Sequence, residues 1–496
     1  MRARDTWVLI ATIVGSSLAF IDGQVVNLAL PQIQRGFHTS AIDVTWIIEL
    51  YTLVLGSLML LGGALADRYG RRRTFTIGVI LFGIGSIACA FSGTLEVMYL
   101  ARVVQGVGGT LLAPASLAIL GAHFTGDARG RAIAAWSAFG ALTSTLGPML
   151  GGILIDSLGW RAVFWINIPL IAVVLYATLR HVTESRDESA PKHLDIFGAV
   201  LTIAGLGGIT YALIDASSRG WNNLDATGSL ISGVAILTFF LVRERSTPNP
   251  IIPPDIFRSR PFGAINLATL FLYGALSALF YMLPFVLIQT HGYTALQTAF
   301  ATLPIAVCLV VLSRFGTAIA ARVGFTTVLT IGPLLVACGF ALLALLSHAG
   351  GYFASLFPGL ALVGVGMGFT VAPLTTAVID AAGPSHVGIA SGINTAIARI
   401  AGLLAVAAAT IVIAALYDQS LDRSLDALHA TSAQRATVDA QRARLGGAQF
   451  SDPRLQSASR DAFDRGFAGV GYGCAILALA AGLVNLAGAR KLRTDV

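Results

Sequence analysis

The chain has 496 residues, of which 55% are hydrophobic and only 11% are charged, and its formal net charge is +7. Soluble proteins carry about 25% charged residues, so this composition excludes an ordinary soluble protein. The sequence therefore indicates an integral membrane protein.

Fourteen apolar runs follow one another along the chain, with turn-forming or charged residues between them. Only helices satisfy their own backbone hydrogen bonds one segment at a time in lipid, so we predict an all-α membrane protein with 14 transmembrane helices. The predicted spans are residues 7–30, 45–65, 74–93, 97–121, 131–155, 161–179, 195–214, 227–242, 262–289, 295–320, 325–347, 352–379, 387–416 and 466–488.

Two acidic residues fall inside the first two spans, Asp22 in the first and Glu49 near the start of the second. An Asp at the centre of a membrane helix costs about 2.5 to 3.5 kcal/mol on insertion scales, so such an acid is by default a proton or substrate site. Two other interpretations stay open. Asp22 can be a structural acid that is permanently paired, and Glu49 can be a residue near the membrane interface with no role in transport.

The short loops on the N-terminal side of the membrane hold most of the Lys and Arg residues, which predicts that both termini are cytoplasmic. The positive net charge then sets topology, and we expect no nucleic-acid partner. The long loop at about 417–465 lies outside in this arrangement. We expect either a partly helical hairpin or lid there, or a solvated loop.

Parts of the sequence recur about 250 residues later. The recurring sets are Gly62, Arg68 and Gly70 with Gly316, Arg322 and Gly324, and Ala113-Pro114 with Ala372-Pro373. Such offsets predict two equivalent six-helix bundles, at 1–182 and 261–496, with two inserted helices at 183–260 between them. Chance matches in a glycine-rich chain are the alternative.

Three motifs stand out. One runs from Gly62 to Arg73 between the second and third spans and contains Gly63, Asp67, Arg68, Gly70 and Arg71. Another is Arg102-x-x-Gln105-Gly106 in the fourth span, and the last is Gly147-Pro148-x-x-Gly151-Gly152 in the fifth. Small residues allow helices to approach closely, and Asp67 can pair with an Arg or a helix N-terminus.

In these motifs the chain resembles the major facilitator superfamily. Asp22 with the Asn27 to Pro31 segment is similar to the first-helix motif of its fourteen-helix drug and proton antiporters, although Gln24 stands where that group usually has Thr. The last motif resembles the antiporter motif of the family, with Thr143 in place of its first Gly.

The resemblance implies roles for these residues. Asp22, Glu49 and Arg102 would couple transport to protons, with Arg102 able to tune both acids or to act as a structural clamp. The Gly63 to Arg71 motif would form a cytoplasmic gate. The antiporter motif would bend its helix and seal the outer half against proton leak, or simply provide close helix packing.

In the second half, Asn394 and Arg399 lie one turn apart inside an apolar span. An Arg in lipid must face the interior or reach the interface, so Arg399 with Asn394 is a candidate part of the substrate cavity, together with Asp22, Glu49 and Asn27. Arg314, near a predicted cytoplasmic helix end, is more simply structural.

The sequence has no Gly-x4-Gly-Lys-Ser/Thr phosphate loop and no cluster of metal-ligating residues, so we expect no cofactor, no metal and no enzymatic activity. We predict a monomeric antiporter of the cell's inner (plasma) membrane. Its partners would be protons, the lipid bilayer and a small-molecule substrate, a lipophilic and in particular cationic drug exported by alternating access. The alternatives are an exporter of one lipid-like or biosynthetic molecule, a proton-coupled importer, and a membrane sensor that does not transport.

Overall fold

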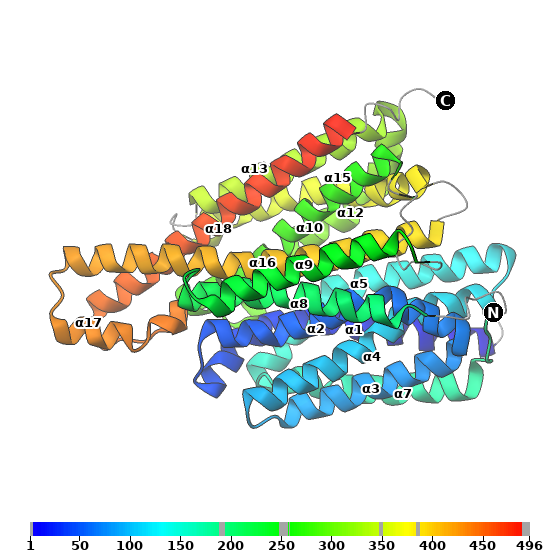
Figure 1. Ribbon diagram of the computed structural model, residues 1–496, viewed down its shortest axis with the longest axis horizontal. Helices are drawn as coiled ribbons and strands as arrows, with labels where there is room; N and C mark the ends of the chain where they lie inside the picture. Colours follow the sequence, from blue (N-terminus) through cyan, green and yellow to red (C-terminus); the bar gives the residue numbers. More distant parts are fainter. Residues whose placement is uncertain are drawn as a thin grey trace. The chain divides into compact units, whose positions relative to one another are not determined.

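The computed structural model describes residues 3–187, 194–247, 256, 258–346, 351–382 and 387–488. Within these residues all regular structure is helical (Figure 1). The elements are α1 (Ala3–Phe37), α2 (Ala41–Tyr69), α3 (Arg71–Phe91), α4 (Leu95–His123), α5 (Gly126–Leu158), α6 (Ala162–Trp165), α7 (Asn167–His181), α8 (Ile196–Arg219), α9 (Leu224–Glu244), α10 (Arg260–Phe285), the π-helix η2 (Val286–Thr290), α11 (Ala295–Ala301), α12 (Leu303–Val323), α13 (Phe325–Leu346), α14 (Tyr352–Ser355), α15 (Phe357–Ala382), α16 (Val387–Ala427), α17 (Ser432–Asp439), the 3-10 helix η4 (Arg442–Gly447) and α18 (Pro453–Gly488).

The described part of the chain contains 13 helical segments that are long and apolar enough to cross a membrane. Each of them overlaps one of the predicted spans, and the prediction of an all-helical membrane protein is confirmed. The remaining predicted span, 131–155, lies within α5, a helix of 33 residues. At 1.5 Å per residue this helix exceeds the hydrocarbon core of about 30 Å.

The contacts divide the chain into two compact units. The first consists of residues Met1–Phe37, Asp43–Gly207 and Val234–Ile252, and the second of His38–Ile42, Gly208–Gly233 and Pro253–Val496. The inserted helices α8 and α9 are thus shared between the units. Our division into two bundles with an insertion at 183–260 stays a prediction.

Glycines allow the same close helix pair in each unit. In the first unit a Cβ on Gly85 of α3 would lie 2.7 Å from the backbone nitrogen of Gln105 in α4. In the second unit a Cβ on Gly339 of α13 would lie 2.7 Å from the backbone nitrogen of Val363 in α15. No side chain fits at either place, so the backbones touch. The same close helix contact in both units accounts for glycines that recur at similar positions in the two halves of the sequence.

The segment around 417–465 contains helices, as the hairpin interpretation expected. Helix α16 continues to Ala427, α17 and η4 follow, and α18 begins at Pro453. Figure 1 shows α17 at the far end of the paired helices α16 and α18. Arg442 ties the segment together through ion pairs with Asp418, Asp422 and Asp439, at 3.3, 2.6 and 3.0 Å.

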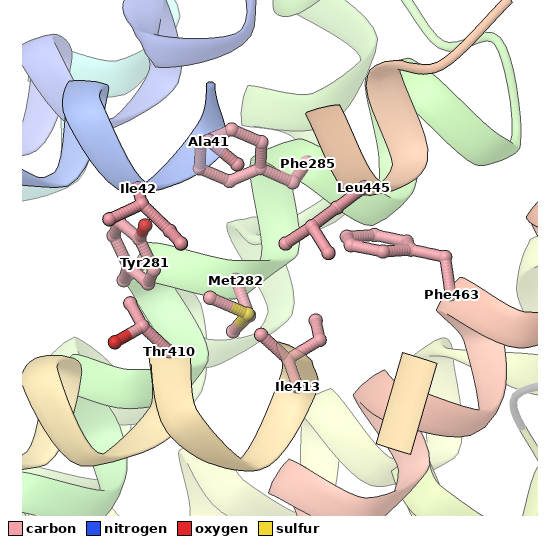
Figure 2. A pocket seen from close by; sticks show the side chains of 9 residues that line it. All are labelled: Ala41, Ile42, Tyr281, Met282, Phe285, Thr410, Ile413, Leu445 and Phe463. Carbon is pink, nitrogen blue, oxygen red and sulfur yellow. The ribbon is translucent and has the colours of Figure 1, made fainter. Parts of the chain in front are cut away.

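The segment around 417–465 packs against the second unit at a small apolar cavity. Its lining includes Tyr281 and Phe285 from α10, Ile413 from α16 and Phe463 from α18, and Figure 2 shows Leu445 of η4 among them. The backbone of Leu445 has φ 50° and ψ −128°, a conformation that costs a non-glycine residue about 1 to 3 kcal/mol. Burial of the leucine side chain offsets that cost.

Candidate functional site

Asp22 is buried in the first unit, where its carboxylate accepts two hydrogen bonds from α4. Arg102 Nη1 donates to Oδ2 at 2.6 Å, and Gln105 Nε2 donates to Oδ1 at 2.8 Å. The side chains of Asp22 and Arg102 are both 0% exposed. The structure thus brings together the acid of the first span and the Arg of the fourth span that the sequence singled out.

The Nε and Nη1 atoms of the Arg102 guanidinium group have hydrogen-bond partners, whereas Nη2 has none among the described residues. Its Nε donates to the carbonyl oxygen of Ile47 at 2.8 Å, its Nη1 also donates to Gln105 Oε1, and its Cζ lies 4.2 Å from the centre of the Tyr51 ring. Its Nη2 is buried and has no hydrogen-bond partner among the described residues. Breaking a buried pair of this kind costs about 3 to 5 kcal/mol because one charge is left uncompensated.

A polar chain extends from this pair into two further helices. Gln105 Nε2 donates to Ser86 Oγ of α3 at 3.0 Å, and Asn167 Nδ2, at the start of α7, donates to the same oxygen at 3.1 Å. All three side chains are buried. The sequence analysis missed Ser86 and Asn167. The Arg-x-x-Gln spacing does place Gln105 on the Arg102 face of the helix, but nothing in the sequence indicates its partners.

Glu49 is as deeply buried as Asp22 but has a different environment. It is 1% exposed, and neither of its carboxylate oxygens has a hydrogen-bond partner among the described residues. Arg102 contacts α2 at Ile47 and Tyr51, so it does not hold Glu49. A buried carboxylate without a partner is costly until a proton or a cation neutralises it.

Asn27 lies five residues after Asp22 on α1. Its Nδ2 donates to the Gly23 carbonyl oxygen at 3.1 Å, whereas its Oδ1 is buried without a partner among the described residues. No hydrogen bond joins it to the Asp22 pair in the described part of the chain. Its free acceptor is available to a donor that enters from outside the network.

The antiporter motif packs against the turn of α1 that carries Asp22. A Cβ on Gly147 would lie 3.8 Å from Ile21, and a Cβ on Gly151 would collide with the Val25 side chain. Gly152 is also buried, and Pro148 lies inside the same continuous helix α5. The glycines therefore allow α5 to touch α1 on both sides of the acid.

The predicted gate motif forms the link between α2 and α3. Arg71 Nη2 pairs with Asp67 Oδ1 at 2.8 Å, and Gly70 adopts φ 111°, which favours glycine. Arg68 stacks its guanidinium on Tyr69 at 5.0 Å. A Cβ on Gly63 would lie 3.5 Å from Pro114 in α4.

Glu184, which the sequence analysis missed, binds the start of α3 although it lies more than 100 residues later in the sequence. Its two carboxylate oxygens accept from the backbone nitrogens of Arg72 and Arg73, at 3.1 and 3.0 Å. Those are exposed donors of the first turn of α3, so Glu184 caps the helix. A Cβ on Gly70 would lie 2.7 Å from Glu184, which is a second reason for glycine there.

In the second unit, Asn394 belongs to a small polar cluster between α16 and α10. Its Nδ2 donates to Asn266 Oδ1 at 3.0 Å and to Thr269 Oγ1 at 2.9 Å. Arg399 is half-buried, within electrostatic reach of the Tyr273 hydroxyl. Arg314 is exposed on α12 and takes no part in this cluster.

The sequence matches the family model "Major Facilitator Superfamily" over residues 12–406. The chain belongs to the major facilitator superfamily. It is 32% identical to the Multidrug resistance protein Stp of Mycobacterium tuberculosis (strain CDC 1551 / Oshkosh) over 86% of this chain and 79% of that protein. It is 31% identical to the Tetracenomycin C resistance and export protein of Streptomyces glaucescens, over 84% and 77% of the two chains.

Solved structures agree on the fold. A bacterial homologue of the human lysosomal transporter Spinster matches with a TM-score of 0.69 and 16% identity, over 99% of this chain and 98% of that one. This major facilitator is therefore a multi-pass membrane transporter that handles small-molecule substrates, and it is not an enzyme.

Proposed function

We propose that this transporter exports lipophilic, chiefly cationic, drugs in exchange for protons. The names of the relatives support drug export, since they are a multidrug resistance protein and a resistance and export protein. The observation that carries the coupling is the buried Asp22 carboxylate, whose hydrogen-bond donors among the described residues are Arg102 and Gln105. Export of one biosynthetic molecule is the second candidate, because the Streptomyces relative is named for a single antibiotic.

Asp22 is the proton carrier in this proposal. A proton on its carboxylate removes the charge that holds Arg102, so protonation weakens the contact between α1 and α4. Because Gly147 and Gly151 bring α5 against the same turn of α1, the loosened turn can shift the antiporter motif. Proton binding and helix rearrangement become one event, as an exchanger requires.

Glu49 is the second acid, and in this proposal it determines which substrate charge can be transported. Exchange of one proton for one monovalent cation moves no net charge, whereas a divalent cation needs two protons. The membrane potential would otherwise oppose export by about 2.3 kcal/mol for each charge and 100 mV. A buried carboxylate without a partner can take either the second proton or the cation itself.

The other site residues have more local roles. Asn27 in the first unit, and Asn394 and Arg399 in the second, are candidates for polar contacts with the substrate. Asp67, with Arg71, forms the cytoplasmic gate that must rearrange in each cycle, and the antiporter motif seals the outer half against protons. The transporter works as a monomer in the inner membrane with both termini cytoplasmic, an orientation supported by the distribution of Lys and Arg.

The experiment uses inverted membrane vesicles that contain the protein and ethidium as a lipophilic cation. An imposed pH gradient should drive ethidium accumulation in the wild type and not in Asp22→Asn, which keeps the size of the side chain. Asp5→Asn is the control, because Asp5 lies on the same helix but pairs with His123 at 3.0 Å. Full gradient-driven accumulation by Asp22→Asn would contradict the proposal.

A further inference from the structure

The polar chain runs from Asp22 through Gln105 and Ser86 to Asn167, and the donor and the acceptor of each of its hydrogen bonds can be assigned. Both protons of the Gln105 amide nitrogen are used, one toward Asp22 Oδ1 at 2.8 Å and one toward Ser86 Oγ at 3.0 Å. The amide oxygen therefore faces Arg102 Nη1. Ser86 Oγ accepts from two amide groups, because Asn167 Nδ2 donates to it as well at 3.1 Å.

This order suits the ionised form of Asp22, and it does not suit a carboxylic acid whose Oδ1 carries the proton. If the Gln105 amide turned over, its oxygen would face the carboxylate and its nitrogen would face the guanidinium, and both contacts would repel. Ser86 would also lose the donor that Gln105 supplies. As long as Asp22 carries a charge, the hydrogen bonds of the polar chain keep the Gln105 amide in one orientation.

A proton on Asp22 Oδ1 reverses the requirement. The carboxylic acid is now a donor, and Gln105 can accept from it only with its oxygen turned toward α1. Ser86 can follow, because its hydroxyl rotates and can donate to that oxygen while it still accepts from Asn167. The turned amide then presents its nitrogen to Arg102, which loses an acceptor together with the charge of Asp22.

We propose that Ser86 and Asn167 position the Gln105 amide so that its orientation follows the protonation state of Asp22 and releases Arg102 when the proton arrives. Neither residue touches a proton in transit. They act through Gln105 and are positioning residues. The inference rests on the proposed function, in which Asp22 carries the proton.

Few other titratable groups face this site from the helices around it. Arg102 faces it from α4, Cys89 from α3 and Tyr51 from α2, where the Tyr51 hydroxyl donates to the Ala19 carbonyl oxygen at 3.2 Å. Helix α5 presents glycine there, and α7 presents Asn167. Among the described neutral groups, the Cys89 thiol contacts the amide oxygen of Gln105 at 3.9 Å, whereas Ser86, with Asn167 behind it, contacts the amide nitrogen that serves Asp22.

The test compares Ser86→Ala and Asn167→Leu with wild type in gradient-driven ethidium transport measured as a function of pH. Loss of either group frees the amide, so the ionised carboxylate loses a fixed donor. The pH of half-maximal transport should rise by about 1 unit, which corresponds to one hydrogen bond to a charged group. Ser86→Thr, which keeps the hydroxyl, should retain the wild-type midpoint.

Ser16→Ala is the matched control, since Ser16 is a buried serine whose hydrogen bonds among the described residues stay within its own helix, to the Thr12 and Ile13 carbonyl oxygens. Unchanged midpoints in both variants, with only slower transport, would overturn the inference, because a merely structural role changes rate alone. If one variant fails to fold, the other decides, since it alters a different helix. Asp22→Asn separates the two proposals. If it abolishes pH dependence while Ser86→Ala leaves the midpoint unchanged, only the positioning role fails.

Discussion

Replacing Arg102 with methionine tests the charge pairing around Asp22. Arg102→Met keeps the length and apolar volume of the side chain but leaves the Asp22 carboxylate with the single donor from Gln105. It also removes the donor to the Ile47 carbonyl oxygen. Both partners are completely buried, so the loss leaves an uncompensated charge, and the unfolding free energy should fall by about 3 to 5 kcal/mol.

Removing the charge of Asp22 as well shows whether the uncompensated charge causes this loss. The double variant Asp22→Asn/Arg102→Met removes both charges and should recover about 2 kcal/mol or more of the loss. Denaturant unfolding of the purified protein in detergent measures these differences, with exposed Arg314→Met as a control that should change little. A double variant as unstable as Arg102→Met would refute the reasoning.

The remaining predictions concern the antiporter motif, the second acid and the gate. Gly151→Ala should abolish transport, because its Cβ collides with Val25, and Val25→Ala in the same chain should restore it; failure of that rescue would argue against a packing role. Glu49→Gln should reduce transport of a dicationic substrate more than that of a monocationic one, and equal losses would show that Glu49 does not select by charge. Asp67→Ala should slow exchange without changing substrate affinity, and a parallel fall in measured binding would place Asp67 in the cavity instead.

The sequence singled out Asp22, Glu49 and Arg102 as candidate site residues because lipid leaves few options for a buried charge. Asp22 and Arg102 both lie inside apolar spans, and each is too costly to stay alone. Which acid takes the Arg could not be predicted, because that depends on how each helix is rotated about its axis. Arg102 contacts α2 at Ile47 and Tyr51, and positions two residues apart on a helix point in nearly opposite directions, so Glu49 faces elsewhere.

Contacts between distant parts of the chain could not be predicted from the sequence either. Glu184 looks like an ordinary charged loop residue, yet it caps α3 from more than 100 positions away along the chain. Ser86 and Asn167 are uncharged residues within apolar spans, and only the folded arrangement shows that Gln105 and Asn167 both donate to the Ser86 oxygen. The helices themselves were easier to predict, because hydrophobic length alone determines them in a membrane.

Proton release on substrate binding tests the central claim most directly. Purified wild-type protein in weakly buffered detergent solution should release protons when ethidium is added, because the rearrangement that admits the cation returns Asp22 to its ionised pair with Arg102. Asp22→Asn should bind ethidium and release no proton from this site. Equal proton release by the wild type and Asp22→Asn would contradict the account, because the exchanged proton would then reside on another group.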